Sequence, residues 1–412
     1  MTYDFDKPVH RFGTSCVKYD EMPNEDTIAL WVADMDFETA PSVLEALQRR
    51  MAHGCFGYVC TPDSYYEAVI KWFQHRHGTT IQRDWFILVP GIVPAIAAIL
   101  RGYRIYRQNQ SKCVESQTQS QPLDRMGVLV QSPAYNCFYS CVRNAECEPI
   151  ENRLVLGEDG RYQVDWDDFE AKCALPQTHV FLLCNPHNPT GRVWTREELS
   201  RMGDICKRNN VLVVADEIHC EFVNPSLGRP YVPFCEASDA PSVMCISPSK
   251  AFNIAGLQIA NIIVRDEALR TAIDRAVNIH EVCDVNVFGI EALQGAYSPQ
   301  GEEWLDQLLD YIYGNYDTMC QLIADRLPQW RVMPLEGTYL MWVDISATGM
   351  TSEQLAYKLL SEANVYVNPG TMYDQWATAT TPNAGNRYIR VNLATQRANL
   401  VEAVRRIAKI HN

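Results

Sequence analysis

Short apolar runs alternate with helical patterns through the first two thirds of the chain. Between the runs, apolar residues recur at the three- and four-residue spacing of helices, as in residues 92–100 and 195–208. The runs themselves carry no charge, which is typical of strands covered on both faces. We therefore predict an α/β domain with a mostly parallel sheet. The apolar runs span residues 86–89, 127–131, 179–184, 211–214, 242–246 and 258–264.

The pattern changes beyond about residue 289, where a long helical stretch precedes short strands and two further helices. Elements in this proportion predict a small α+β domain packed on the first. The strands are expected at residues 331–333, 339–344, 365–368 and 388–393, and the helix between them at 352–362.

The N-terminal stretch 28–37 reads IALWVADMDF, an apolar segment with two acids. We interpret it as an arm that packs on the body of the protein. The predicted division of the chain is therefore an N-terminal arm with part of the small domain (1–50), a large domain (51–289) and a small C-terminal domain (290–412).

Composition narrows the class of protein. The chain has 412 residues, 47% hydrophobic and 21% charged, so it exceeds the size of a single core. Its formal net charge of −14 argues against nucleic-acid and anionic-membrane partners, since both need basic surface. No run approaches the ~18 apolar residues of a membrane span, and the acid-rich start does not resemble a signal peptide.

The 15 cysteines are scattered without a C-x-x-C pair, and the nine histidines lack the spacing of a zinc site. We therefore expect free cysteines in a reducing compartment and no metal site. Together with the absence of a membrane or secretion signal, this predicts a cytoplasmic protein.

A lysine follows two serines directly after the apolar run 242–246. In the sequence SPSK, Ser247 and Ser249 precede Lys250, which places two hydroxyls and an amine at the end of a strand. Hydroxyls can donate to phosphate oxygens, and a desolvated lysine with a lowered pKa can form a Schiff base with an aldehyde. Pyridoxal phosphate carries both groups, so the pairing hints at that cofactor. A solvated surface lysine is the alternative.

Three other residues stand at strand ends or inside a strand. Asp216 follows the run 211–214 and is either a helix cap or a carboxylate facing a protonated ring nitrogen. Arg390 interrupts an apolar strand, where an anionic ligand or a structural carboxylate would offset the cost of burial. Tyr135, at the end of a strand in the sequence SPAY, lies either flat on a planar ring or in the core.

Two glycine turns, one tyrosine and one polar stretch complete the set of candidate features. The strand, Pro-Gly turn and helix start at 86–100 present free backbone N–H groups to an anion. Residues 185–191, NPHNPTG, predict a rigid turn. Tyr58, beside Gly57, remains a candidate for function or for the core. The Gln- and Ser-rich stretch 108–121 is interpreted as a solvent loop without an assigned role.

Taken in order, these motifs resemble fold-type I pyridoxal-phosphate enzymes of the class I/II aminotransferase superfamily, over nearly the whole chain. The resemblance implies the aspartate aminotransferase fold, a PLP-dependent transferase-like α/β architecture. A large cofactor domain with a mostly parallel seven-stranded sheet, flanked by helices, then joins a small α+β domain. It also implies pyridoxal 5'-phosphate, an amino-acid substrate and a homodimer with composite active sites. The motifs are PGIV, SPAY, NPHNPTG, ADEIH, SPSK and YIRVN.

The resemblance assigns roles to the ring and substrate contacts. Lys250 would carry the cofactor and, once released from it, act as general base. Asp216 would pair with the pyridine nitrogen, and Tyr135 would stack on the ring. Asn188 would donate to the ring 3′-oxygen and border the substrate. Arg390 would hold the substrate α-carboxylate through a bidentate contact.

The phosphate contacts follow from the same resemblance. Ser247, Ser249 and the backbone amides of Ile92 and Val93 would bind the phosphate. Tyr58 would reach the phosphate of the neighbouring subunit and complete its catalytic site.

Two positions depart from the wider superfamily. Gln258 stands where an arginine usually binds the phosphate, and His219 stands where a tyrosine often contacts the 3′-oxygen. Both departures, with the sequences WVADMDF and DEIH, resemble the MalY/PatB branch of cystathionine β-lyases.

We therefore hypothesise a carbon–sulfur β-lyase that acts on cystathionine, cysteine or related S-conjugates and releases a thiol, pyruvate and ammonia. Two alternatives remain at the level of sequence. One is an aminotransferase, since the same residues serve transamination. The other is a MalY-like regulatory protein that binds a transcription factor.

Overall fold

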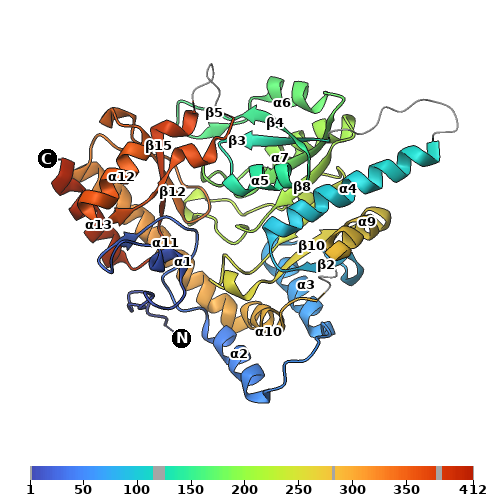
Figure 1. The fold of residues 1–412 in the computed structure, drawn as a ribbon, viewed down its shortest axis with the longest axis horizontal. Coiled ribbons are helices and arrows are strands. Elements are labelled where there is room, and N and C mark those ends of the chain that lie inside the picture. The colour runs from blue at the N-terminus through green and yellow to red at the C-terminus, as the bar shows by residue number, and fades with distance from the viewer. Residues whose placement is uncertain (1, 115–125, 281–283, 377–382, 412) are drawn as a thin grey trace.

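The computed structural model describes residues 2–114, 126–280, 284–376 and 383–411 (Figure 1). Within these residues the largest sheet has seven strands in the order β2-β10-β9-β8-β7-β3-β4. Strands β9, β8, β7, β3 and β4 are parallel, whereas β10 runs antiparallel to β9 and β2. The predicted mostly parallel, seven-stranded sheet is confirmed. Its strands are β2 (Phe86–Val89), β3 (Gly127–Ser132), β4 (Glu148–Arg153), β7 (Thr178–Cys184), β8 (Leu212–Asp216), β9 (Ser242–Ile246) and β10 (Ala260–Val264).

Successive strand residues enter two different cores, which explains the uninterrupted apolar runs. In β7, Val180 and Leu182 pack with the residues of α4, α5 and α9, whereas Phe181 and Leu183 pack on the other face with α6, α7 and α8. Because helices cover both faces of the sheet, neither face is exposed to solvent. The helices are α4 (Ile92–Val114), α5 (Asn136–Asn144), α6 (Trp166–Cys173), α7 (Arg196–Arg208), α8 (Phe234–Ala237) and α9 (Glu267–Val277).

Helix α4 extends beyond the prediction. A helix over 92–100 and a solvent loop from 108 were expected, but the helix continues to Val114. The loop prediction is therefore wrong for its first part, and residues 115–121 lie outside the described residues. Helix α4 packs on α9 near Gly102, where an added Cβ would lie 2.8 Å from the Ile273 Cα, whereas residues 108–110 are exposed.

The C-terminal domain is α+β, as predicted. Its antiparallel sheet has the order β11-β12-β15-β14, and side chains of α11, α12 and α13 share one core with it. The N-terminal strand β1 (Ile28–Ala29) pairs in parallel with β13 (Val365–Tyr366), which ties the arm to this domain. The other elements are α11 (Pro299–Arg326), β11 (Arg331–Val332), β12 (Leu340–Asp344), α12 (Ser352–Ala363), β14 (Asn368–Pro369), β15 (Tyr388–Asn392) and α13 (Arg397–His411).

Three helices lie together beside the large sheet (Figure 1) and share a core with Met244 of β9 and Ile263 of β10: α2 (Pro41–His53), α3 (Asp63–His77) and α10 (Val287–Ala296). Helices α2 and α10 touch through Ser42, whose hydroxyl donates to the Gly295 carbonyl at 2.7 Å. The short elements are α1 (Val17–Asp20), β5 (Val155–Leu156) and β6 (Tyr162–Gln163). Across the described ranges, none of the helices combines the length and apolar character needed to span a bilayer.

The segment 31–37, which we call the N-terminal segment, is bonded to both domains. Asn253 of the large domain makes three hydrogen bonds to its backbone at 2.9 to 3.0 Å. Asn392 of the small domain donates to the carbonyls on either side of Ala33, at 2.7 and 2.6 Å. Asn253 is close in sequence to Lys250, and Asn392 is close to Arg390. These contacts therefore place the arm beside both Lys250 and Arg390.

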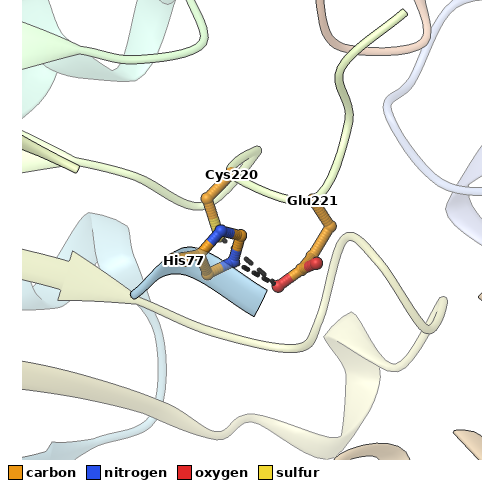
Figure 2. A group of neighbouring side chains, drawn as sticks. All are labelled: His77, Cys220 and Glu221. Atoms are coloured by element: carbon orange, nitrogen blue, oxygen red, sulfur yellow. Dashed lines mark hydrogen bonds and ion pairs between the residues drawn. The ribbon is translucent and has the colours of Figure 1, made fainter. Parts of the chain in front are cut away.

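The turn after β8 is anchored by a buried carboxylate (Figure 2). Glu221 accepts from Trp72 Nε1 at 2.7 Å and from Arg76 Nε at 2.8 Å, and its third contact is His77 Nε2 at 2.9 Å. The Cys220 thiol lies 3.8 Å from the same carboxylate. Burial alone would raise the pKa of Glu221, but His77, Arg76 and Trp72 together lower it to about 2.

Glu221→Gln is expected to lower the free energy of unfolding by about 3 kcal/mol, because it leaves the Arg76 charge without its buried partner. A carboxyl group whose pKa is lowered in the folded protein stabilises the fold at pH values above its pKa in the unfolded chain, near 4.5. This contribution is lost as pH falls towards about 2. The variant's thermal stability should therefore depend less on pH over that range. Glu67→Gln, which breaks an exposed pair with Lys71, serves as the control. Equal stability of the two variants would contradict the anchoring role.

Candidate active site

Asp216 ends strand β8, and its carboxylate is buried. One oxygen accepts from the Ile218 backbone N–H at 3.2 Å, and among the described residues no cation pairs with it. Burial raises the pKa of Asp216 to about 7, against the opposing effects of that hydrogen bond and of Lys250. A buried acid at a strand end without a cationic partner suits a positively charged ligand group.

Lys250 lies in the turn after the neighbouring strand β9, and the pairing of Asp216 with Cys245 aligns the two strand ends. Its Nζ donates to the Ala33 carbonyl at 2.6 Å. Burial lowers the pKa of Lys250 to about 8, although Asp34 acts in the opposite direction. A lysine in this environment spends an appreciable fraction of time as a neutral, nucleophilic amine near neutral pH.

Both residues line one cavity of about 190 Å³ at the carboxyl ends of the parallel strands. This is the edge at which ligands gather in doubly wound sheets. Eight of the eleven residues proposed from sequence line it: Ile92, Val93, Tyr135, Asn188, Asp216, His219, Ser249 and Lys250.

One end of the cavity has groups that suit an anion. Gly91 and the first residues of α4, Ile92 and Val93, border it, and the free N–H groups of a helix start favour negative charge. Ser249 borders the cavity as well. Ser247 does not line it: its hydroxyl donates to the Ile259 carbonyl at 2.7 Å and accepts from the Ser249 N–H at 3.0 Å. Ser247 therefore holds the turn that carries Ser249 and Lys250.

Arg390, in the middle of β15, is buried without a carboxylate partner among the described residues. Its guanidinium donates to Asn188 Oδ1 at 3.2 Å and to the Trp31 carbonyl at 2.7 Å, while Nε has no partner in the described structure. The guanidinium carbon of Arg390 lies 4.9 Å from the ring centre of Tyr373. A buried cation bonded only to neutral groups suits an anionic ligand.

His219 follows Asp216 in the same turn and is buried. Burial lowers the pKa of His219 well below its usual value, and the charges of Lys250 and Arg390 add to that effect, so the imidazole is neutral. Its Nδ1 finds no hydrogen-bond partner in the described residues. The ring is held against Tyr339, with centroids 5.7 Å apart.

Tyr58 is fully exposed and lies outside the cavity of its own chain. It precedes α3 in a stretch with other exposed apolar side chains, including Met51 and Phe56.

Sequence reasoning missed residues that act through the backbone. Ala33 borders the cavity, and its carbonyl accepts from both Lys250 and Tyr339. The Trp31 carbonyl accepts from Arg390. The apolar segment 28–37 with two acids was the available signal. It indicated an arm that packs on the body and the resemblance to the MalY/PatB branch, but no contact with Lys250 or Arg390.

The donor set fits a planar cofactor with a basic ring nitrogen, an aldehyde and a phosphate. The buried Asp216 carboxylate and the Lys250 amine border the same cavity, and the start of α4 borders it too. His219 Nδ1 and Arg390 Nε are buried polar atoms left without partners among the described residues. Pyridoxal phosphate supplies groups that suit Asp216, Lys250, His219 and the start of α4. The carboxylate of an amino acid suits Arg390.

Residues 25–407 match the family of class I and II aminotransferases. The chain belongs to this family.

Within the family, the chain is similar to cystathionine β-lyase PatB of Bacillus subtilis (strain 168), with 34% identity over 98% of both chains. It is 29% identical to protein MalY of Escherichia coli (strain K12), over 98% of this chain and 97% of MalY. The PLP-bound C-S lyase from Staphylococcus hominis superimposes with a TM-score of 0.84 at 29% identity, over 99% of this chain and 98% of that one. The predicted resemblance to the MalY/PatB branch is confirmed.

Proposed function

We propose that the protein is a pyridoxal-phosphate-dependent carbon–sulfur β-lyase that acts on cystathionine, cysteine or related S-conjugates. One observation carries the proposal: an acid and an amine, Asp216 and Lys250, line one cavity from adjacent strand ends. The chain that holds them is similar throughout its length to a relative named cystathionine β-lyase.

We propose the following cofactor contacts, which the lining of the cavity supports. Lys250 would carry the aldehyde carbon, and Asp216 would pair with the ring nitrogen. Tyr135 would stack on the ring, and Asn188 and His219 would contact its 3′-oxygen. The Ile92 and Val93 amides would bind the phosphate together with Ser249. For Ser247 we propose support of this turn, since its hydroxyl is bonded to Ile259.

When bound, pyridoxal phosphate draws electrons away from the substrate Cα, so that a carbanion there becomes accessible. The chain supplies the remaining functions. Arg390, with Asn188 beside it, would hold the α-carboxylate. Lys250, displaced by the substrate amine, would take the Cα proton as a neutral base. The Cβ–S bond then breaks, and the sulfur leaves with the electron pair as a thiolate that gains a proton. Water converts the remaining three-carbon fragment to pyruvate and ammonia.

Pyruvate release from cystathionine without any keto-acid acceptor tests the proposed function. The lyase should form pyruvate and a thiol at equal rates in the absence of an acceptor. Strict dependence on an acceptor would contradict it and favour the second candidate, an aminotransferase. The aminotransferase candidate is favoured by the same site, because Lys250 and Asp216 serve proton loss at Cα in both reactions.

Arg390→Lys is expected to raise KM about tenfold or more, because a lysine cannot make the two parallel hydrogen bonds of a guanidinium to a carboxylate. The effect on kcat should be smaller. Steady-state kinetics with cystathionine measures both parameters. Arg387→Lys, three residues earlier and exposed, is the control and should leave KM unchanged. A normal KM in Arg390→Lys would exclude carboxylate binding by this residue.

We propose that the working unit is a homodimer in which Tyr58 reaches the phosphate of the partner's site. Its full exposure, beside exposed Met51 and Phe56, supports this proposal. Mixing inactive Tyr58→Ala and Lys250→Ala subunits should restore part of the activity, because one site of each mixed dimer keeps both residues. No recovery after subunit exchange would oppose a composite site.

The proposed domain roles follow the predicted division, with residues 51–289 as cofactor domain, 290–412 as small domain and 1–50 as the N-terminal arm and part of the small domain. We also propose a cytoplasmic location, which the free state of every described cysteine supports. A labelled protein found outside the cytoplasm would oppose it.

A further inference from the structure

The Ala33 carbonyl oxygen accepts two hydrogen bonds inside the site. One comes from Lys250 Nζ at 2.6 Å, and the other from the Tyr339 hydroxyl at 3.0 Å. Tyr339 is fully buried immediately before β12, and its ring packs on His219 and Phe222. Tyr339 does not line the cavity, so it lies one step behind the residues that would touch the cofactor.

The direction of this carbonyl is fixed by its neighbours. The Asp34 N–H donates to the Val32 carbonyl at 3.0 Å, which closes a tight turn with Ala33 at its centre. Asn392 bonds the Val32 and Asp34 carbonyls at 2.7 and 2.6 Å. The Ala33 carbonyl therefore cannot rotate away without breaking contacts on both sides.

The hydrogen bond from the Tyr339 hydroxyl weakens the one that the Ala33 carbonyl accepts from Lys250. A carbonyl oxygen that accepts from an ammonium group stabilises the charged form of the amine. The oxygen has two lone pairs, and a donor on the second one reduces its strength as an acceptor for the first. Burial raises the pKa of Tyr339, so its hydroxyl remains a donor throughout the working range of pH.

We propose that Tyr339 is a positioning residue that shares the Ala33 carbonyl with Lys250 and thereby keeps the lysine available as a neutral base. This inference rests on the proposed function. It concerns the stage at which the substrate amine has displaced Lys250. In that step the Cα–H bond breaks, an N–H bond forms on Lys250, and the electron pair stays with the substrate carbon. The new ammonium group then donates to the Ala33 carbonyl.

Other charged and titratable groups also face Lys250 from the surrounding elements. They are Asp34 on the N-terminal segment, Asp216 at the end of β8, His219 in the turn that follows, Cys137 on α5 and Arg390 on β15. Tyr339→Phe leaves all of them in place and keeps the ring that packs on His219. The variant therefore isolates the one hydroxyl.

In Tyr339→Phe, kcat is expected to fall about fivefold near neutral pH, the effect of one hydrogen bond, with KM unchanged. The acid limb of the kcat profile should move to higher pH, because the unshared carbonyl stabilises the ammonium form of Lys250. Above about pH 9 the variant should approach the wild-type kcat, since the amine is then neutral in both. Substrate deuterated at Cα should show a larger isotope effect on kcat in the variant near neutral pH.

A second readout does not require turnover. The full-length apoprotein is mixed with pyridoxal phosphate, and the rate at which visible absorbance appears is followed as a function of pH. This rate depends on the neutral fraction of the Lys250 amine. Its pH dependence should shift upward in Tyr339→Phe in the same way as the acid limb of kcat.

Tyr313→Phe is the matched control. Tyr313 is equally a buried tyrosine whose hydroxyl donates to a backbone carbonyl, that of Thr338 at 3.2 Å, next to Tyr339 in sequence. It should leave both pH profiles and the isotope effect at wild-type values. If Tyr339→Phe matches this control, or if its loss of kcat is the same at every pH, the proposal is overturned.

Failure of the Tyr339 proposal can be distinguished from failure of the proposed lyase function. Loss of the Cα proton begins both elimination and transamination, so the isotope effect and kcat profile can be measured on whichever product the wild type forms. A wild type that releases no pyruvate without an acceptor would overturn the lyase function and leave this test intact. A wild-type apoprotein that never acquires the visible absorbance would overturn both.

Discussion

Lys250→Ala is expected to abolish turnover, by about 10⁴-fold or more, and to remove the visible absorbance of the cofactor-loaded protein. The side chain supplies both the attachment of the cofactor and the base for the Cα proton. Lys250 is the one lysine bordering the described cavity, so no neighbouring amine replaces it. Pyruvate formation and the absorption spectrum measure the two losses independently.

The control for this variant is Lys358→Ala. Lys358 also donates to a backbone carbonyl, that of Ile410 at 3.3 Å, but it lies on α12 in the small domain. Its spectrum and turnover should match the wild type. Retention of either property in Lys250→Ala would remove that residue from its proposed role.

The second large effect is expected for Asp216→Asn, which should lower kcat about 10³-fold. Asparagine keeps the size and can keep the hydrogen bond to Ile218, but it carries no charge to hold a protonated ring nitrogen. Proton loss at Cα then has a weaker electron acceptor, whereas binding of the cofactor phosphate is unaffected. Single-turnover kinetics with Cα-deuterated substrate should locate the loss in this step.

Glu217→Gln provides a control one residue away. Burial raises the pKa of Glu217 to about 8, so this acid is largely protonated near neutral pH. Its oxygen accepts from the Phe234 N–H at 2.8 Å, a bond that glutamine can also accept. Its kcat should stay within about threefold of wild type. If Asp216→Asn is as active as Glu217→Gln, a charge at position 216 has no part in catalysis.

The sequence predicted the sheet and the cavity well because both depend on local pattern. Asp216 and Lys250 each follow an apolar run, and parallel strands bring their carboxyl ends to the same edge of the sheet. The observed register, with Asp216 beside Cys245, places these ends together. The glycine turn before α4 likewise indicated the helix start that borders the cavity.

The sequence could not predict contacts that depend on the direction of single bonds. The Ala33 carbonyl has no side-chain identity, and its two donors come from residues 250 and 339, distant in sequence. Ser247 and Ser249 look equivalent in SPSK, but only the fold shows that the Ser247 hydroxyl is bonded to Ile259. The close approach of α4 to α9 at Gly102 likewise depends on a contact between segments that are distant in sequence.

Borohydride reduction of the cofactor-loaded protein, followed by proteolysis and mass spectrometry, tests the central claim most directly. Reduction converts the bond between a lysine and pyridoxal phosphate into a stable secondary amine. We predict that the phosphopyridoxyl group is found on the peptide that contains Lys250, at close to one group per chain. Modification of a different lysine, or of none, would contradict it.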